Sequence, residues 1–382
     1  MSATRKHVRL RAFFVLSAAV AAAACSLLNP LDGYSGGSVP DASTPPLADG
    51  PTNVPDADVP DVRACKPKRT PERPAPSDTT TRERLVLAAD MLEIGKAEEG
   101  YDVDNLCTCP EKSACASTAT NLARCDTDGG VDNALGPETL AVVGLLPATG
   151  GFRPGSGTDL IRAGRYNFFL EVRGYNNTND DDEVQVGVLG SGGLEVPDGG
   201  DPDAGPRFDG QDTWSVDRDS VLGQQTTPPY EARGVDTRAY VRDGTLVARL
   251  DLDLRVGVLY TKFRESVITG RIVRDGGQVR LVDGMVSGRI RSTDVLTSMQ
   301  TLKSPFANTY LCRNEPVYLE AKRRICAALD LPASSASDGK DAPCEASSFT
   351  MVFSAKPAKM GSLVSVPLDK PCGIDWTDEC PR

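Results

Sequence analysis

The chain has 382 residues, of which 42 are Lys or Arg and 53 are Asp or Glu, giving a net charge of −11. An acidic surface repels the phosphate backbone that dominates nucleic-acid affinity, so this charge excludes nucleic acid as a partner. The same charge disfavours electrostatic docking onto anionic membrane surfaces.

Residues 1–24 have the pattern of a secretory signal peptide. Four basic residues precede an uncharged apolar run at residues 12–24: Arg5, Lys6, Arg9 and Arg11. The run is shorter than the roughly 20 residues that a membrane-spanning helix needs. Removing these four positive charges from the net charge of −11 leaves about −15 on the mature chain.

Cys25 follows three alanines at residues 22–24. This stretch resembles the lipobox of bacterial lipoproteins, whose cysteine is acylated and becomes the mature N-terminus. The resemblance implies a lipid anchor on Cys25 and membrane contact through that lipid. Because Ser26 rather than Asp follows, it also implies the outer membrane of a Gram-negative-type cell envelope. The alternative is ordinary cleavage after Ala24, which leaves Cys25 unmodified.

Residues 25–78 are rich in Pro, Asp, Gly and Ser, and Tyr34 is their one aromatic residue. Such a sequence cannot bury enough apolar surface to offset the entropy lost on ordering. We therefore predict a lipidated N-terminus followed by a disordered tether over residues 25–78. Residues 79–382 are expected to form a single β-rich domain stapled by disulfides.

Apolar and polar residues alternate in the predicted domain. This period of two predicts half-buried strands, the clearest of them at residues 165–172, 184–188, 246–258 and 349–355. Asp243-Gly244 and residues 275–277 predict hairpin turns. Strands without alternating helices favour a mainly β fold, an antiparallel two-sheet sandwich, with the jelly roll as one form. Residues 191–235, rich in Gly, Pro and Asp, are expected to be a long surface loop.

A few short helices are expected. One begins near Pro137, and another spans residues 314–329 with Pro316 in its first turn. At 1.5 Å per residue the second helix would separate Cys312 from Cys326 by roughly 15 to 20 Å. That distance is too long for a disulfide, so these cysteines are expected to have different partners.

The 11 cysteines support both lipidation and disulfides. If Cys25 carries lipid, ten remain in two groups of five: Cys65, Cys107, Cys109, Cys115 and Cys125, then Cys312, Cys326, Cys344, Cys372 and Cys380. Because each group is odd, full oxidation requires at least one bridge between the groups. Zinc is the alternative for the last four cysteines of the first group, but their spacing lacks the usual C-x2-C pairs.

Histidine chemistry is excluded in the mature chain, because His7 is the only histidine and lies in the signal peptide. Ser-His-Asp and Cys-His catalysis are therefore excluded, and no catalytic residue set is predicted. A carboxylate-dependent hydrolase of polysaccharide needs only two placed acids and remains the alternative function. Trp214 is the candidate platform on which a sugar ring could stack.

Residues 125–136 read CDTDGGVDNALG and offer several oxygen ligands. They resemble acidic calcium loops of secreted proteins, in which glycines allow a tight bend around a hard cation. The predicted metal ligands are Asp126, Asp128, Asp132 and Asn133, with Asp102 and Asp104 from upstream. Calcium is the one cofactor expected. The alternative is an Asx-turn followed by the cap of the helix near Pro137.

Together these features favour an envelope-anchored lipoprotein with a non-catalytic binding or structural domain. The expected ligand is a glycan or another envelope protein. The blocks GYDVDNLCTC and SSFTMVFSAKPAKMG resemble those of secreted bacterial lipoproteins of unassigned function. That resemblance therefore implies no particular activity.

Overall fold

The computed structural model describes residues 67–77, 80–108, 113–118, 125–127, 129–145, 156–197, 199–201, 204–256, 259–304, 309–367 and 370–381. Cys25 and the signal segment lie outside the described residues. The chain divides into two units, Met1–Asp61 and Val62–Arg382. All described residues belong to the second unit.

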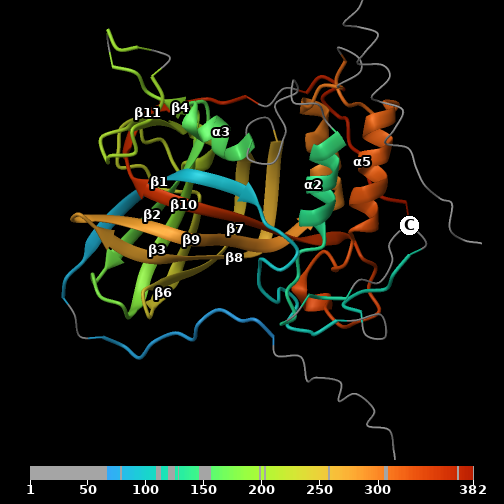
Figure 1. Cartoon of the computed structure of the whole chain (residues 1–382), viewed down its shortest axis with the longest axis horizontal. Helices are drawn as coiled ribbons and strands as arrows, with labels where there is room; N and C mark the ends of the chain where they lie inside the picture. Colours follow the sequence, from blue (N-terminus) through green and yellow to red (C-terminus); the bar gives the residue numbers. More distant parts are fainter. Residues whose placement is uncertain are drawn as a thin grey trace, which may run out of the picture. The chain divides into compact units, whose positions relative to one another are not determined.

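Eight antiparallel strands close into a barrel (Figure 1). Each strand pairs with the next barrel strand along the chain, and the first pairs with the last. In order around the barrel they are β1 (Glu83–Ile94), β2 (Asn167–Tyr175), β3 (Asp181–Ser191), β6 (Gly234–Arg242), β7 (Thr245–Val256), β8 (Leu259–Asp275), β9 (Gln278–Arg291) and β10 (Ala346–Pro357). The predicted two-sheet sandwich is therefore wrong, although the mainly β class and the hairpin connections are correct.

Closure depends on β1, which pairs with strands on both of its edges. Leu87 of β1 lies opposite Leu170 of β2 on one side and Pro357 of β10 on the other. Register shifts between Ala89 and Met91 in β1, and others in β7 to β10, mark bulges. Bulges bend a strand and increase its twist, which lets one sheet curl until its two edges meet.

Apolar side chains fill the barrel interior. On β7 the alternating residues of the predicted strand are buried as far as residue 254: Leu246, Ala248, Leu250, Leu252 and Leu254. The rings of Phe168 and Phe353 meet edge-on inside the barrel, with centroids 5.5 Å apart. The interior of the described barrel is thus a hydrophobic core shared by all eight strands.

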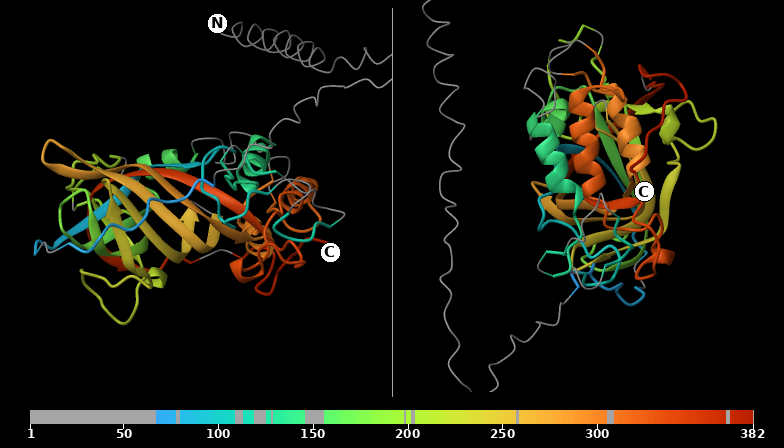
Figure 2. Two further views of the ribbon diagram at one scale, coloured as in Figure 1. Left: turned by 90° about the horizontal axis from the view of Figure 1, so that it is seen from below. Right: turned by 90° about the vertical axis from the view of Figure 1, so that its right-hand side faces the viewer.

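Helices cover one end of this barrel (Figure 2). There α2 (Leu135–Leu145) lies beside α5 (Pro316–Ala327), and α4 (Ser292–Ser298) follows directly after β9. Both predicted helices are confirmed, and Pro316 opens α5 as expected. Another short helix, α3 (Ser156–Arg162), packs on β1. None of the helices in the described ranges has the length and apolar character needed to cross a bilayer.

The predicted surface loop at residues 191–235 contains regular structure. Within it β4 (Gly193–Leu194) and β5 (Thr213–Asp217) join β11 (Lys359–Val364) in a separate three-stranded sheet. Trp214 of β5 is fully buried in a second apolar cluster. The indole ring therefore packs inside the protein and offers no stacking platform for a sugar.

Three disulfides have both of their cysteines and their geometry defined within the described residues. Cys115 pairs with Cys344, and their Cα atoms are 5.2 Å apart, so the predicted bridge between the two cysteine groups is confirmed. Cys312–Cys372 and Cys326–Cys380 confirm that the cysteines at the two ends of α5 have different partners. Cys107 and Cys125 are disulfide-bonded as well. Cys65 and Cys109 lie outside the described residues.

Residues 67–77, which fall in the predicted tether, lie against the barrel wall and are called the strap below (blue in Figure 1). The Tyr240 hydroxyl donates to the Pro71 carbonyl at 2.5 Å. The Arg249 guanidinium donates to the Thr70 hydroxyl at 2.8 Å. The Arg73 guanidinium also stacks over the Tyr240 ring, 4.7 Å from its centroid.

Candidate metal site

Three aspartates come together at the helical end of the barrel. Asp102 and Asp104 lie in the loop that follows β1, and Asp132 lies just before α2. One carboxylate oxygen from each lies within 4.8 Å of the other two. The three residues are only 8%, 5% and 3% exposed, respectively. This cluster could hold a metal ion.

Backbone amides fix the geometry of the cluster. Oδ2 of Asp132 accepts hydrogen bonds from the N–H groups of Val103 at 2.7 Å and Asp104 at 3.3 Å. Oδ1 of Asp104 accepts one from the Leu106 N–H at 2.7 Å. Each bond orients a carboxylate whose other oxygen remains available.

Glycines shape the turn that delivers Asp132. Gly129 and Gly130 have φ angles of 85° and 65°, a left-handed conformation that favours glycine. The turn is closed by the Gly130 N–H, which donates to the Thr127 carbonyl at 3.0 Å. Asp132 then joins the upstream loop, because its own N–H donates to the Tyr101 carbonyl at 3.1 Å.

Several carboxylate oxygens in the cluster lack a protein partner. Both oxygens of Asp102 and Oδ2 of Asp104 are fully buried and have no hydrogen-bond partner among the described residues. A buried polar group without a partner costs roughly 1–3 kcal/mol, and a charged one costs more. These buried carboxyl groups are therefore stabilised by protonation with a hydrogen bond between Asp102 and Asp104, or by a bound cation.

The electrostatics of the cluster favour the neutral acids when no cation is bound. Burial, reinforced by the nearby charge of Asp126, raises the pKa of Asp104 to about 8. Burial and the charges of Asp104, Asp330 and Asp126 raise the pKa of Asp132 well above its usual range. Burial also raises the pKa of Asp102. A cation would reverse these shifts, because opposite charge favours the ionised carboxylate.

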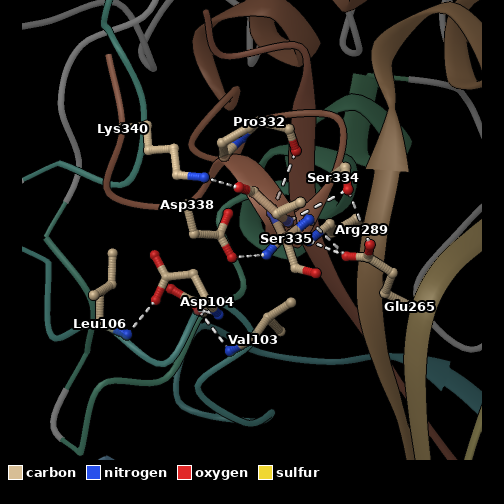
Figure 3. A network of polar contacts seen from close by, with 12 residues as sticks. Val103, Asp104, Leu106, Glu265, Arg289, Pro332, Ser334, Ser335, Asp338 and Lys340 are labelled. Carbon is tan, nitrogen blue, oxygen red and sulfur yellow. Dashed lines mark hydrogen bonds and ion pairs between the residues drawn. The ribbon is translucent and has the colours of Figure 1, made fainter. Parts of the chain in front are cut away.

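A buried arginine lies next to this cluster (Figure 3). The Arg289 side chain is 1% exposed and pairs with Glu265 at 2.9 Å and with Oδ2 of Asp338. It also donates to the Pro332 carbonyl at 3.2 Å. Oδ1 of Asp338 is buried without a hydrogen-bond partner among the described residues.

The loop of Asp338 touches the loop of Asp104. A Cβ placed on Gly339 would lie 3.2 Å from Cδ1 of Leu106, which places the two loops in contact, as Figure 3 shows. Asp338 therefore adds a fourth buried carboxyl group beside the three-aspartate cluster. The positive charge of Arg289 partly neutralises the charge of this carboxylate.

The other predicted ligands have different roles. Oδ2 of Asp126 accepts from the Thr108 N–H at 2.7 Å, and Oδ1 accepts from the Thr108 hydroxyl. The Asn133 amide donates to the carbonyls of Gly95 at 3.1 Å and Lys96 at 2.6 Å. Its oxygen accepts from the Thr350 N–H at 2.9 Å, so Asn133 braces α2 against the barrel. Asp128 lies outside the described residues.

Sequence reasoning thus placed three of the clustered residues in the candidate set, but treated Asp102 and Asp104 as auxiliary. It missed Asp338 and Arg289. Arg289 lies in β9 between Gly288 and Ile290. Its side chain is buried because the loop at residues 330–340 covers it. No local sequence pattern predicts that a loop far along the chain buries this side chain.

A cleft of about 790 Å³ lies elsewhere along the barrel wall. Asp253 lies in it and accepts from the Tyr260 hydroxyl at 2.5 Å and from Arg264 at 2.9 Å. Asp251, also in the cleft, accepts from the Glu265 N–H at 2.9 Å. These two carboxylates are already bonded within the protein.

No protein-family model, curated protein or solved structure matches the chain. The function must therefore be argued from the residues of the site itself.

Proposed function

We propose that the barrel is a calcium-stabilised, non-catalytic binding domain of an exported lipoprotein. The observation that carries the proposal is the set of buried oxygens on Asp102 and Asp104 that have no hydrogen-bond partner among the described residues. With Asp132 they surround a point where a cation would meet one oxygen from each side chain.

Calcium suits this donor set better than other biological cations. The site offers only carboxylate oxygens, and the mature chain has no histidine to favour zinc or copper. Calcium accepts six to eight oxygens in flexible geometry, whereas magnesium demands a near-ideal octahedron and usually keeps several waters. Three carboxylates carried by two loops therefore favour calcium, with backbone carbonyls or water completing the shell.

Export to an oxidising compartment is supported by the disulfides. Three bridges in the described residues are what an envelope or extracellular protein would carry. Calcium is abundant outside cells, and extracellular modules bind it with dissociation constants of roughly 10⁻⁴ to 10⁻³ M. Lipid on Cys25 would then hold the domain at the outer membrane, where it would bind a glycan or another envelope protein.

A binding role is favoured over polysaccharide hydrolysis. A hydrolase needs two carboxyl groups that reach the substrate. The oxygens of Asp102 and Asp104 that lack partners are buried, and Trp214 is enclosed in a core cluster. These features suit a structural cation better than a catalytic acid pair.

Thermal unfolding tests the calcium site. At about 10 mM calcium, tenfold above the weakest affinity expected, linkage should add about 1.4 kcal/mol, a rise of a few degrees in the unfolding midpoint over EDTA. Asp132→Asn should abolish the rise. Asp283→Asn is the control and should keep it, because that carboxylate is exposed, pairs with Arg271 and is not one of the charges that shift the cluster. Equal midpoints with calcium and EDTA in the wild type would refute the proposal.

Metabolic labelling tests the anchor separately. Cells given a fatty-acid probe should label the wild-type chain and not the Cys25→Ser variant. Equal labelling of the two would refute lipidation at Cys25 and leave the calcium site unaffected.

A further inference from the structure

The strap is bonded to both loops of the metal cluster through one residue. The Lys68 N–H donates to the Gly129 carbonyl at 2.5 Å, in the turn that delivers Asp132. The Lys68 carbonyl accepts from the N–H of Asp102 at 3.1 Å. Lys68 therefore bridges the two chain segments that a cation would also bridge.

Beyond Lys68 the strap is held at its middle and at its C-terminal end, where the Ser77 N–H donates to Asp182 at 2.9 Å and the Asn176 amide donates to the Ser77 hydroxyl at 3.2 Å. Tyr240 and Arg249 bond its middle, and the Arg73 side chain donates to the carbonyls of Asp182 and Arg238. Most strap residues are exposed, and Pro74 is the one strap residue that is buried. Segments with little burial and few contacts open at low free-energy cost. The two backbone bonds of Lys68 thus hold the N-terminal end of the strap, which is the end that contacts the cluster.

We propose that calcium at Asp102, Asp104 and Asp132 controls the docking of the strap. This inference rests on the proposed calcium site. With the cation bound, the loops of Asp102 and Asp132 are held at the spacing that both bonds of Lys68 require. Without it the bonds from Val103 and Asp104 to Asp132 still join the loops, but the carboxylates of Asp102 and Asp132 lose their common ligand and the bonds of Lys68 weaken.

Release of the strap would change the reach of the domain. The strap has 11 residues at the C-terminal end of the predicted tether, just before β1. A freed chain of this length spans at most about 36 to 40 Å when extended. Calcium would therefore set how far the barrel can move from its attachment point, and whether the strap is accessible to proteases.

Hydrogen exchange measured by mass spectrometry tests the coupling. We expect the Lys68 amide, followed in peptides that begin several residues before it, to exchange at least about tenfold more slowly with calcium than with EDTA, because it donates to the loop of Asp132. A peptide covering β11 should not change and serves as the internal reference. If terbium or calcium binds but exchange in the strap is unaltered, the coupling is wrong while the calcium site stands. If neither ion binds, both proposals fail.

Reciprocity gives a second test. If calcium strengthens strap docking, then strap docking must strengthen calcium binding by the same factor. Arg249→Met removes the bond to Thr70 without touching the cluster and should weaken calcium affinity severalfold, about fivefold at the lower end of typical couplings. Arg271→Met is the matched control, since its partner is the exposed Asp283. Unchanged affinity in Arg249→Met would overturn the inference.

Discussion

The Val103 N–H donates a 2.7 Å hydrogen bond to Oδ2 of Asp132, a residue 29 positions further along the chain. The Asp104 N–H reaches the same oxygen at 3.3 Å. These bonds hold the two loops of the cluster together in the absence of a cation. The site is therefore pre-organised, and a cation would supply the partner that the remaining oxygens lack.

Calcium-free protein should lose stability as the pH rises, because of Asp104. Burial raises its pKa to about 8, so the folded state holds this proton more tightly than the unfolded state. The stabilisation is complete below the unfolded pKa near 4 and disappears as the pH rises to about 8. Asp104→Asn should flatten this slope and raise stability in EDTA at pH 8 by on the order of 2 kcal/mol.

Urea unfolding in EDTA between pH 5 and pH 8 measures this slope. The Asp104→Asn variant should also lose its response to calcium. It should therefore be more stable than the wild type in EDTA at pH 8 and gain no stability when calcium is added. A wild type and an Asp104→Asn variant with parallel pH profiles would contradict the assignment of a buried, protonated carboxyl group.

Removing Arg289 should be strongly destabilising. Its guanidinium pairs with Glu265 and Asp338, and its side chain is 1% exposed. Arg289→Met leaves the Asp338 carboxylate buried without its cation, which should cost about 3–5 kcal/mol. Adding Asp338→Asn to this variant should recover part of the loss. Chemical denaturation of the single and double variants measures both effects, and a loss below about 1 kcal/mol in the single variant would contradict the burial.

The Cys115–Cys344 bridge should stabilise the domain more than the Cys326–Cys380 bridge. They close loops with sequence separations of 229 and 54, so the entropic model favours the longer loop by about 1.3 kcal/mol. Replacing either pair by serine should cost about 2–5 kcal/mol. Unfolding free energies of the two double variants compare them, and the reverse order would show that the native strain or packing dominates.

Full oxidation of the ten predicted disulfide cysteines can be checked on the same material. Exported, denatured and unreduced protein should react with no iodoacetamide, because each cysteine other than Cys25 is expected to be paired. Mass spectrometry that finds two alkylated thiols would contradict complete pairing.

Lys322 should stabilise the domain through Asp378. Burial alone would raise the pKa of Asp378, but hydrogen bonds from Lys322 and Tyr318 outweigh burial and lower it. The resulting stabilisation is present above the usual carboxyl pKa and is lost as the pH falls below it. At pH 7, Lys322→Met should cost about 1–2 kcal/mol. Arg313→Met, whose guanidinium is 3.7 Å from Asp378 and 60% exposed, should cost under about 0.5 kcal/mol by the same denaturation assay.

Local sequence patterns predicted the strands, turns and helices but not the closure of the sheet. The alternating sequence of β7 predicts which of its side chains are buried. Asp243-Gly244 predicts the two-residue turn that joins β6 to β7. Whether Leu87 meets both Leu170 and Pro357 depends on accumulated twist and on bulges along several strands. A pattern of period two is the same in a sandwich and in a barrel.

The candidate site shows the same limit. Acidic residues among glycines mark a loop suited to a cation, and Asp132 lies in the cluster as predicted. Asp126 and Asn133 carry the same chemistry, but Thr108 and Thr350 take up their oxygens. Which oxygens lack a hydrogen-bond partner depends on residues far away in the sequence. Composition alone therefore cannot distinguish a residue that binds a cation from one that only hydrogen-bonds within the protein.

A crystal structure determined with about 10 mM calcium, above the affinity range of extracellular calcium modules, tests the central claim most directly. The account predicts one ion, identified by its anomalous signal, 2.3–2.6 Å from oxygens of Asp102, Asp104 and Asp132, the distance range of calcium ligands. In Asp132→Asn crystals that ion should be missing. A wild-type structure in which the three carboxyl groups instead hydrogen-bond to one another, with no ion between them, would contradict it.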